Sequence, residues 1–296
     1  MTKRHINWAD LLFHIFNYSI LSLLIVVTLY PFYYIFIYSI SDSYLAQRGV
    51  FLWPAGFSLE SYQSTLQLKG LSDAAVVSVL RTVIGTSLTV LSCSFFAYLM
   101  TKQEMPLRST IYRFVIITMY FNAGFIPWYL TMKAYGLQNS FLLYVIPSAL
   151  AGYYVILIKT FIENLPASLE ESAKIDGAGY GVIFARIIFP LSMPIIATIA
   201  VFAAVSQWNT WFDNYFLVEN PRLQTLQLIL YQYLNQTNAI ANMTVDEMTR
   251  GTLNKVMTPQ SIRMTITFIV TLPIVIVYPM LQRFFVKGIM MGAIKG

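Results

Sequence analysis

The chain has 296 residues, of which 57% are hydrophobic and 11% are charged, and its formal net charge is +6. Soluble domains typically carry about 25% charged residues, so this composition excludes an ordinary soluble protein and predicts that lipid surrounds most of the chain. Cys93 is the one cysteine, which excludes an intramolecular disulfide and a thiolate metal site, and His5 and His14 cannot build a metal cluster alone.

Runs without Asp, Glu, Lys or Arg recur along the chain at lengths near the roughly 20 residues that cross a bilayer as a helix. They predict an all-α polytopic membrane protein with six transmembrane helices in a single domain, residues 1–296. The predicted spans cover about 11–40, 78–101, 111–132, 140–160, 184–211 and 262–284. The first run is too long for a signal-peptide core and lacks a small-residue cleavage pattern, so we expect an uncleaved anchor.

A further uncharged run, 223–245, is rich in glutamine and asparagine, whose amides cannot sit unpaired in hydrocarbon. The segment 221–234 alternates apolar and amide residues at near-helical spacing and predicts an amphipathic helix at the membrane interface. It belongs to a long loop, 213–261. After it, Thr258 and Pro259 predict the cap and first turn of the last span.

Basic residues are denser on the side of the membrane that would hold both termini and the loop 163–183. Because cytoplasmic loops carry an excess of Lys and Arg, this side is predicted to be cytoplasmic and the loop 213–261 to lie outside. Membrane orientation accounts for the positive net charge, so a nucleic-acid partner is not needed.

The loop between the fourth and fifth spans reads PASLEESAKIDGAGY at 166–180. Ser168 and Glu171 have the spacing of a capping box, and Gly177 supplies a helix stop, which together predict a short helix over 169–176. A helix of about two turns is marginal in water. It must therefore either pack against its own protein or dock onto a partner.

The order Glu171-Ser172-Ala173, Asp176-Gly177-Ala178, then Phe184, Ile187 and Pro190, resembles the EAA loop of ABC importer permeases, the inner-membrane components of binding-protein-dependent transport. Ser172 replaces an alanine and Phe189 a leucine of that pattern. The stretches 97–102, 135–140, 208–213 and 282–296 are also similar to the family. They point to its carbohydrate subgroup, near the short maltose-type permease and the lipo-oligosaccharide and alginate-type permeases.

This resemblance implies a type I ABC importer permease fold in which the loop's short helix is a coupling helix bound by a cytoplasmic ATPase. The implied coupling residues are Glu170, Glu171, Ser172, Ala173, Asp176, Gly177 and Ala178. The C-terminal tail, with Gly288, Gly292 and Lys295, is implied to contact the two ATPase subunits. The implied partners are a second homologous permease, two ATP-binding subunits, an extracytoplasmic solute-binding protein and an oligosaccharide, in a bacterial cytoplasmic membrane.

The chain contains no phosphate-binding P-loop and no catalytic constellation, so we expect it not to be an enzyme and to bind no cofactor. ATP and Mg²⁺ are expected in the partner ATPases. A cluster near the outer end of the fifth span mixes flat apolar faces with hydrogen-bonding groups, as a sugar requires. Its members, candidates for the translocation pathway, are Trp208, Asn209, Trp211 and Asp213.

Two other functions stay open at this point. A secondary transporter would usually carry ionisable residues inside its spans, where this chain offers only Arg81 and Asp213, both at predicted helix ends. A membrane scaffold without transport would not need the polar loop. An alginate-like substrate would favour a basic pathway, but the outer segments hold similar numbers of basic and acidic residues, and the partner permease can hold the substrate site instead.

Overall fold

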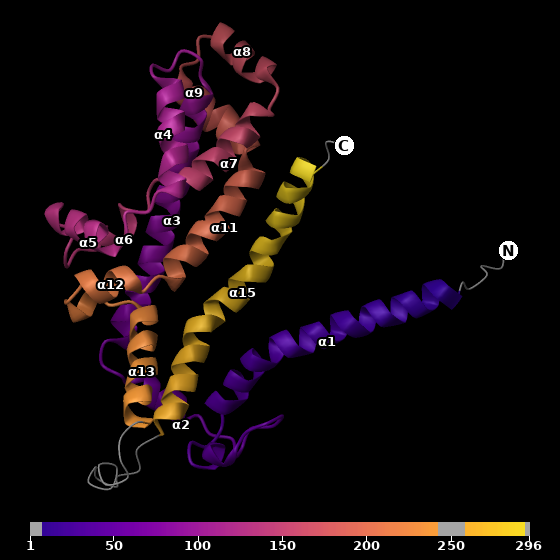
Figure 1. Cartoon of the computed structure of the whole chain (residues 1–296), viewed down its shortest axis with the longest axis vertical. Helices are drawn as coiled ribbons and strands as arrows, with labels where there is room; N and C mark the ends of the chain where they lie inside the picture. The colour runs from indigo at the N-terminus through magenta and orange to yellow at the C-terminus, as the bar shows by residue number, and fades with distance from the viewer. Residues whose placement is uncertain (1–7, 242–257, 294–296) are drawn as a thin grey trace. The chain divides into compact units, whose positions relative to one another are not determined.

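The computed structural model describes residues 8–241 and 258–293, with side chains described over 10–235, 258–277 and 279 (Figure 1). These residues form helices and turns, and the β-structure among them is one isolated antiparallel bridge between Ser41 and Phe57. The mostly helical fold predicted from the uncharged runs is therefore confirmed.

The helices differ in length far more than the six predicted spans do. In chain order they are α1 (Trp8–Ser39), η1 (Leu45–Arg48), α2 (Glu60–Leu66), α3 (Leu71–Thr101), α4 (Arg108–Tyr120), α5 (Phe125–Ala134), α6 (Leu142–Val145), α7 (Gly152–Glu163), α8 (Ala167–Ile175), α9 (Tyr180–Ile183), η2 (Phe184–Ile188), α10 (Phe189–Leu191), α11 (Met193–Asn209), α12 (Phe212–Leu217), η3 (Pro221–Leu223), α13 (Leu226–Ala241) and α15 (Pro259–Ala293). Among the described residues, three helices are long and apolar enough to cross a membrane, or four if one bent pair forms a single span.

Two of the predicted spans are interrupted. The stretch 111–132 divides where α4 ends and α5 begins, because Gly124 adopts φ +83° and its N–H donates to Asn122 Oδ1 at 2.9 Å instead of to a helical carbonyl. The stretch 140–160 divides between α6 and α7, where Pro147 has no N–H to continue a helix. Neither stretch is one continuous helix.

The stretch 184–211 is bent rather than straight. Its first part contains η2, a π-type turn, and the segment Tyr180–Leu191 meets Met193–Asn209 at 83°. Pro190 and Pro194 flank this bend and each removes a backbone donor, which is a sufficient cause for it.

The described residues divide into two compact units. The first comprises 1–68 and 233–271. Its core contains Ile37 and Tyr38 at the end of α1, with Ala46 and Val50, and the rings of Phe36 and Phe268 lie 5.1 Å apart. Along the most apolar stretch of α1, 6% of the residues are buried, so most of the apolar side chains of this helix are exposed to its surroundings. At the start of α15, Thr258 Oγ1 accepts from the Ser261 N–H at 3.2 Å, which confirms the predicted cap.

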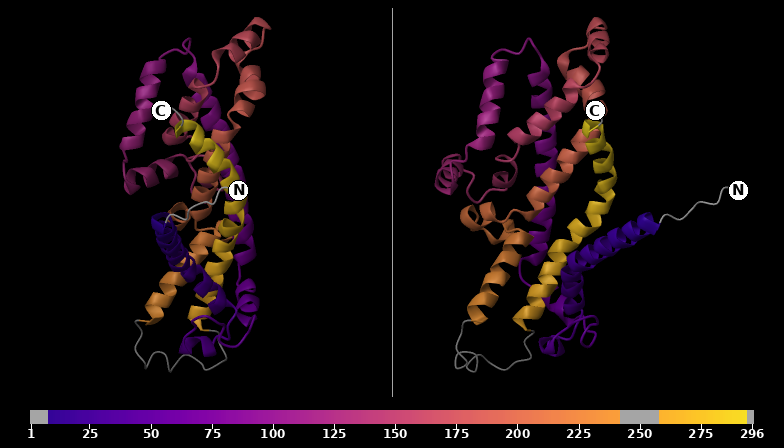
Figure 2. Two further views of the ribbon diagram at one scale, coloured as in Figure 1. Left: turned by 90° about the vertical axis from the view of Figure 1, so that its right-hand side faces the viewer. Right: turned by 45° about the vertical axis from the view of Figure 1, so that its right-hand side comes forward.

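The second unit, 69–232 and 272–296, is built around α3, which packs against α7 and α11 (Figure 1). Gly85 allows the close approach of α3 and α11, because a Cβ there would lie 2.5 Å from Gln207 Nε2. Gly152 does the same between α7 and α4, where a Cβ would lie 3.1 Å from Met119 Cγ. One end of the unit carries α8 and α9 (Figure 2). Ala173 of α8 and Ile183 of α9 belong to the same apolar core as Cys93 and Tyr98. The two sites described next lie at this end and around the middle of α3.

Candidate functional site

The loop helix α8 begins at Ala167, with Pro166 as its N-cap and no side-chain hydrogen bond at that position. The predicted capping box is therefore wrong. Ser168 lies one residue inside the helix, where its carbonyl oxygen accepts from Ser172 Oγ at 2.8 Å. The N-cap residue needs a non-helical backbone, and proline adopts one readily. Pro166 therefore takes the N-cap position in place of Ser168.

The other end of α8 confirms the predicted helix stop. Gly177 adopts φ +77°, its N–H donates to the Lys174 carbonyl at 3.0 Å, and the Ala178 N–H donates to the Ala173 carbonyl at 2.9 Å. This pair of bonds is a Schellman motif, which satisfies two carbonyls at the helix end and turns the chain sharply.

The helix presents two different faces. Ala173 is 9% exposed and packs on the core of its own unit, and Glu170 points to the same side with a side chain that is 16% exposed. Glu171, Ser172 and Ile175 are exposed on the opposite side, and Ile175 is 86% exposed. The two adjacent glutamates therefore have different environments, which residue type alone could not reveal. Ile175 was not among the predicted site residues, although an apolar side chain within a polar loop is a recognisable sign of a contact surface.

Glu170 connects α8 to the end of α3. Its carboxylate is paired with the Lys102 ammonium and accepts a hydrogen bond from the Tyr98 hydroxyl at 3.4 Å. Lys174, one turn further along α8, lies 3.4 Å from the same carboxylate. Partial burial alone would lower the pKa of Lys174, but the hydrogen bond and the charge of Glu170 raise it above the usual lysine value.

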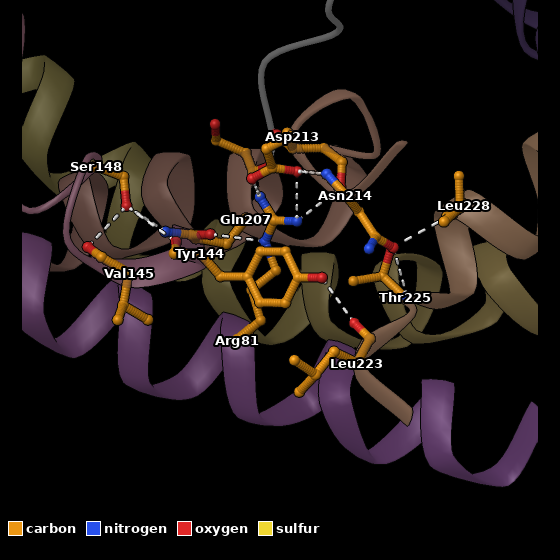
Figure 3. A network of polar contacts seen from close by, with 12 residues as sticks. Arg81, Tyr144, Val145, Ser148, Gln207, Asp213, Asn214, Leu223, Thr225 and Leu228 are labelled. Carbon is orange, nitrogen blue, oxygen red and sulfur yellow. Dashed lines mark hydrogen bonds and ion pairs between the residues drawn. The ribbon is translucent and has the colours of Figure 1, made fainter. Parts of the chain in front are cut away.

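A second polar site surrounds Arg81 on α3. Its guanidinium binds Asp213 with two hydrogen bonds, at 3.0 Å to Oδ1 and 2.6 Å to Oδ2, and donates to Gln207 Oε1 at 3.0 Å and to the Thr210 carbonyl at 3.1 Å (Figure 3). The two charged side chains are 4% and 11% exposed, and the guanidinium lies 4.6 Å from the centre of the Tyr144 ring. No pattern in the sequence indicates that Arg81 and Asp213 meet, because 132 residues separate them.

The hydrogen bonds continue from this ion pair into the segment that leads to α13 (Figure 3). Asn214 Oδ1 accepts from the Thr225 N–H at 2.9 Å, and the Tyr144 hydroxyl donates to the Leu223 carbonyl at 2.7 Å. Ser78 Oγ accepts from the Leu226 N–H at 2.9 Å. These bonds fasten the start of the predicted amphipathic helix, which the structure confirms as η3 and α13, to α3 and α6.

A cavity of about 450 Å³ lies beside the ion pair. Arg81, Gln207 and Asp213 form one part of its wall, and the remainder mixes aromatic rings with hydroxyl groups; its members include Trp128, Tyr144, Ser148, Tyr153, Tyr154 and Ser206. Rings provide flat apolar faces and hydroxyls provide hydrogen bonds, so the wall suits a ligand that has both.

The structure separates the four residues that the sequence grouped as a pathway. Asp213 lines this cavity, whereas Trp208 lines a second, apolar cavity of about 230 Å³ between α3, α11 and α15. Asn209 Oδ1 accepts from Gln227 at 3.1 Å, and the Trp211 ring stacks on Tyr231 with centroids 3.9 Å apart. The four residues were grouped because they are close in sequence. They point to different surroundings because α11 ends at Asn209, in the middle of the group.

The C-terminal residues Gly288 and Gly292 lie within the backbone of α15. Lys295 lies outside the described residues.

Comparison with known proteins gives long matches. No family model matches the chain. Protein LplC of Bacillus subtilis (strain 168) is 35% identical over 295 residues, which is 99% of this chain and 98% of LplC. The polygalacturonan/rhamnogalacturonan transport system permease protein YtcP of the same organism is 32% identical over 286 residues, covering 96% of this chain and 99% of YtcP.

A solved structure agrees with these relatives. It belongs to a bacterial ABC transporter involved in the import of the acidic polysaccharide alginate, and the matched chain has a TM-score of 0.85 and 28% sequence identity. The match covers 96% of this chain and all of that one. Relatives of this identity and coverage share both fold and kind of activity, so the chain belongs to the permeases of ABC transport systems for sugars.

Proposed function

We propose that the chain is the transmembrane permease subunit of an ATP-driven importer and forms half of the translocation pathway for an oligosaccharide. A solute-binding protein would deliver the sugar from outside. A second, homologous permease would complete the pathway, and two cytoplasmic ATP-binding subunits would supply ATP hydrolysis with bound Mg²⁺. The chain would lie in a bacterial cytoplasmic membrane as a multi-pass protein, with both termini and α8 on the cytoplasmic side, as the distribution of basic residues indicates.

The observation that carries this proposal is the exposed face of α8. This helix has nine residues and ends in a Schellman motif. The side chain of Ile175 is 86% exposed and offers an apolar contact beside the carboxylates of Glu171 and Asp176. An ATPase cleft with an apolar pocket and basic groups at its rim would complement that face. Ser172 and Gly177 would allow close approach and a sharp exit. The tail residues Gly288, Gly292 and Lys295 would add a second contact with the ATPases.

The cavity beside Arg81 supports an oligosaccharide as the substrate. Its volume of about 450 Å³ is within the range of roughly 300–1,000 Å³ that small-ligand sites occupy. Its rings and hydroxyls match the C–H face and the hydroxyl groups of a sugar ring. We propose a polysaccharide fragment, as in the pectic and alginate systems of the relatives, with Asp213 in the pathway wall.

Reconstitution of the complete transporter tests the function. The chain with its partner permease, ATPases and binding protein in proteoliposomes is expected to accumulate labelled oligogalacturonate or alginate oligosaccharide when ATP is enclosed. Glu171→Lys and Ile175→Glu are expected to abolish both ATPase co-purification and uptake. Arg113→Glu, an exposed charge reversal on α4 away from α8, serves as the control and should leave both unchanged.

Two other results would replace this proposal. Uptake that an ion gradient drives without ATP would identify a secondary transporter. A membrane complex that forms without ATPases and moves no sugar would identify a scaffold.

A further inference from the structure

The helix α8 is held by very little apolar contact. Ala173 is its one buried residue, and an alanine side chain contributes a small fraction of the stabilisation that a buried leucine provides. A helix of nine residues does not persist alone in water. Polar contacts must therefore fix its position, and Glu170 makes them.

The contacts of Glu170 come from two directions. Lys174 belongs to α8 itself, at a spacing of four residues, so this pair stabilises the helix without attaching it to anything. Lys102, by contrast, is the C-cap residue that follows α3. Its ammonium lies 4.1 Å from the centre of the Tyr98 ring while it pairs with Glu170. Tyr98, which is fully buried in α3, donates its hydroxyl to the other carboxylate oxygen.

We propose that Glu170, Lys102 and Tyr98 form an internal clamp that makes α8 move as one body with the end of α3. Glu170 is then a positioning residue that faces its own subunit, whereas its neighbour Glu171 faces the ATPase. The proposal rests on the proposed function, since it specifies how a movement of α8 reaches the membrane helices.

The geometry favours a clamp over a solvated surface pair. The side chains of Lys102 and Glu170 are 11% and 16% exposed, so water screens their attraction far less than it would at the surface. The ring of Tyr98 covers the ammonium and its hydroxyl binds the carboxylate, so the pair has a fixed position. The exposed carboxylate of Glu171 has no hydrogen bond or ion pair within the part of the chain that the structure describes.

Four variants of the reconstituted transporter test this division of roles: Glu170→Lys, Lys102→Glu, the double variant Lys102→Glu/Glu170→Lys, and Glu171→Lys. Two quantities are measured, the affinity of the ATPase subunits for the membrane complex and the number of ATP molecules hydrolysed for each sugar imported. A merely structural role would not change the second quantity at constant affinity.

The single clamp variants are expected to keep the ATPase affinity within about twofold of the wild type while the ATP-to-sugar ratio rises on the order of tenfold, a typical loss of coupling between sites. The double variant restores a pair of opposite charges and is expected to recover much of the coupling. Glu171→Lys is expected to show the reverse pattern, with the affinity lost.

Loss of ATPase affinity in Glu170→Lys without recovery in the double variant would overturn the clamp, because Glu170 would then be a docking residue. An unchanged ratio in both single variants would overturn it as well. If the Glu170→Lys protein does not accumulate in the membrane, the isosteric variant Glu170→Gln replaces it, and the same two quantities are measured. The failure of the proposed function looks different: no variant, Glu171→Lys included, would alter ATPase binding.

Discussion

The buried ion pair between Arg81 and Asp213 makes a strong prediction about stability. Asp213→Ala removes both acceptors at 3.0 and 2.6 Å and leaves a guanidinium whose side chain is 4% exposed. It also removes the acceptor of the Asn214 N–H, at 2.8 Å. Arg81 keeps its bonds to Gln207 and Thr210, and the neighbouring cavity admits water. We therefore expect a cost at the lower end of the range for broken buried pairs, about 3 kcal/mol.

Thermal unfolding of the purified chain in detergent measures this cost. One kcal/mol lowers the melting temperature by about 2–4 °C in a protein of 150–250 residues, so Asp213→Ala is expected to melt roughly 6–12 °C below the wild type. Glu104→Ala is the matched control. The Glu104 side chain is 65% exposed and lies 3.8 Å from Lys174, which is itself 40% exposed, so its loss should leave the melting temperature within about 2 °C of the wild type.

A double variant separates charge from packing. Arg81→Met/Asp213→Ala leaves no uncompensated charge and is expected to melt above Asp213→Ala, although Gln207 loses a partner. A melting temperature for Asp213→Ala within about 2 °C of the Glu104→Ala value would refute the reasoning. A double variant that melts below the single one would refute it as well.

Three further outcomes are expected in the same detergent assay. Gly85→Ala places a Cβ 2.5 Å from Gln207 Nε2 and should lower the free energy of unfolding by about 1–3 kcal/mol. Gly181→Ala, where the space beside the glycine is open with no neighbouring segment of the described chain within 4 Å, should be neutral, and equal melting temperatures for the two variants would contradict the close approach at Gly85. Gly177→Ala puts a side chain at φ +77° and should lose about 1–2 kcal/mol and speed proteolysis of the loop, with Gly177→Asn milder; unchanged cleavage would count against it. Cys93, at 0% exposure, should resist a membrane-permeant maleimide until the protein unfolds, so rapid native labelling would be inconsistent with the core.

Features set by local chemistry were predictable from the sequence. The stop at Gly177, the cap at Thr258 and the helix after residue 221 each depend on neighbouring residues, and the structure confirms all three. The capping box at Ser168 failed because two local signals competed there and Pro166 took the position. The sequence could not decide between them, since both are legitimate helix starts.

Features that depend on distant segments were not predictable. Arg81 and Asp213 were recognised as unusual, but their pairing depends on how α3 packs against α11 and on how the chain then turns into α12, and no local pattern specifies that. In the same way, Glu170 and Glu171 are identical in chemistry, and their opposite environments depend on where the end of α3 lies. The interruption of the span 111–132 at Gly124 was missed because apolar composition says nothing about a single backbone angle.

Because of the π-type turn η2, the number of residues between the loop and Pro190 affects how the two are oriented. Such a turn holds one residue more than an α-helical turn, and each residue of an α-helix contributes about 100° of rotation. The turn lies between the Asp176-Gly177-Ala178 segment and Pro190. Deleting Ala185 would leave a regular helix and every motif residue in place, yet rotate α9 by about 100°, roughly a quarter turn, relative to α10. The number of residues between the two segments therefore sets their relative orientation, which the identity of those residues alone does not.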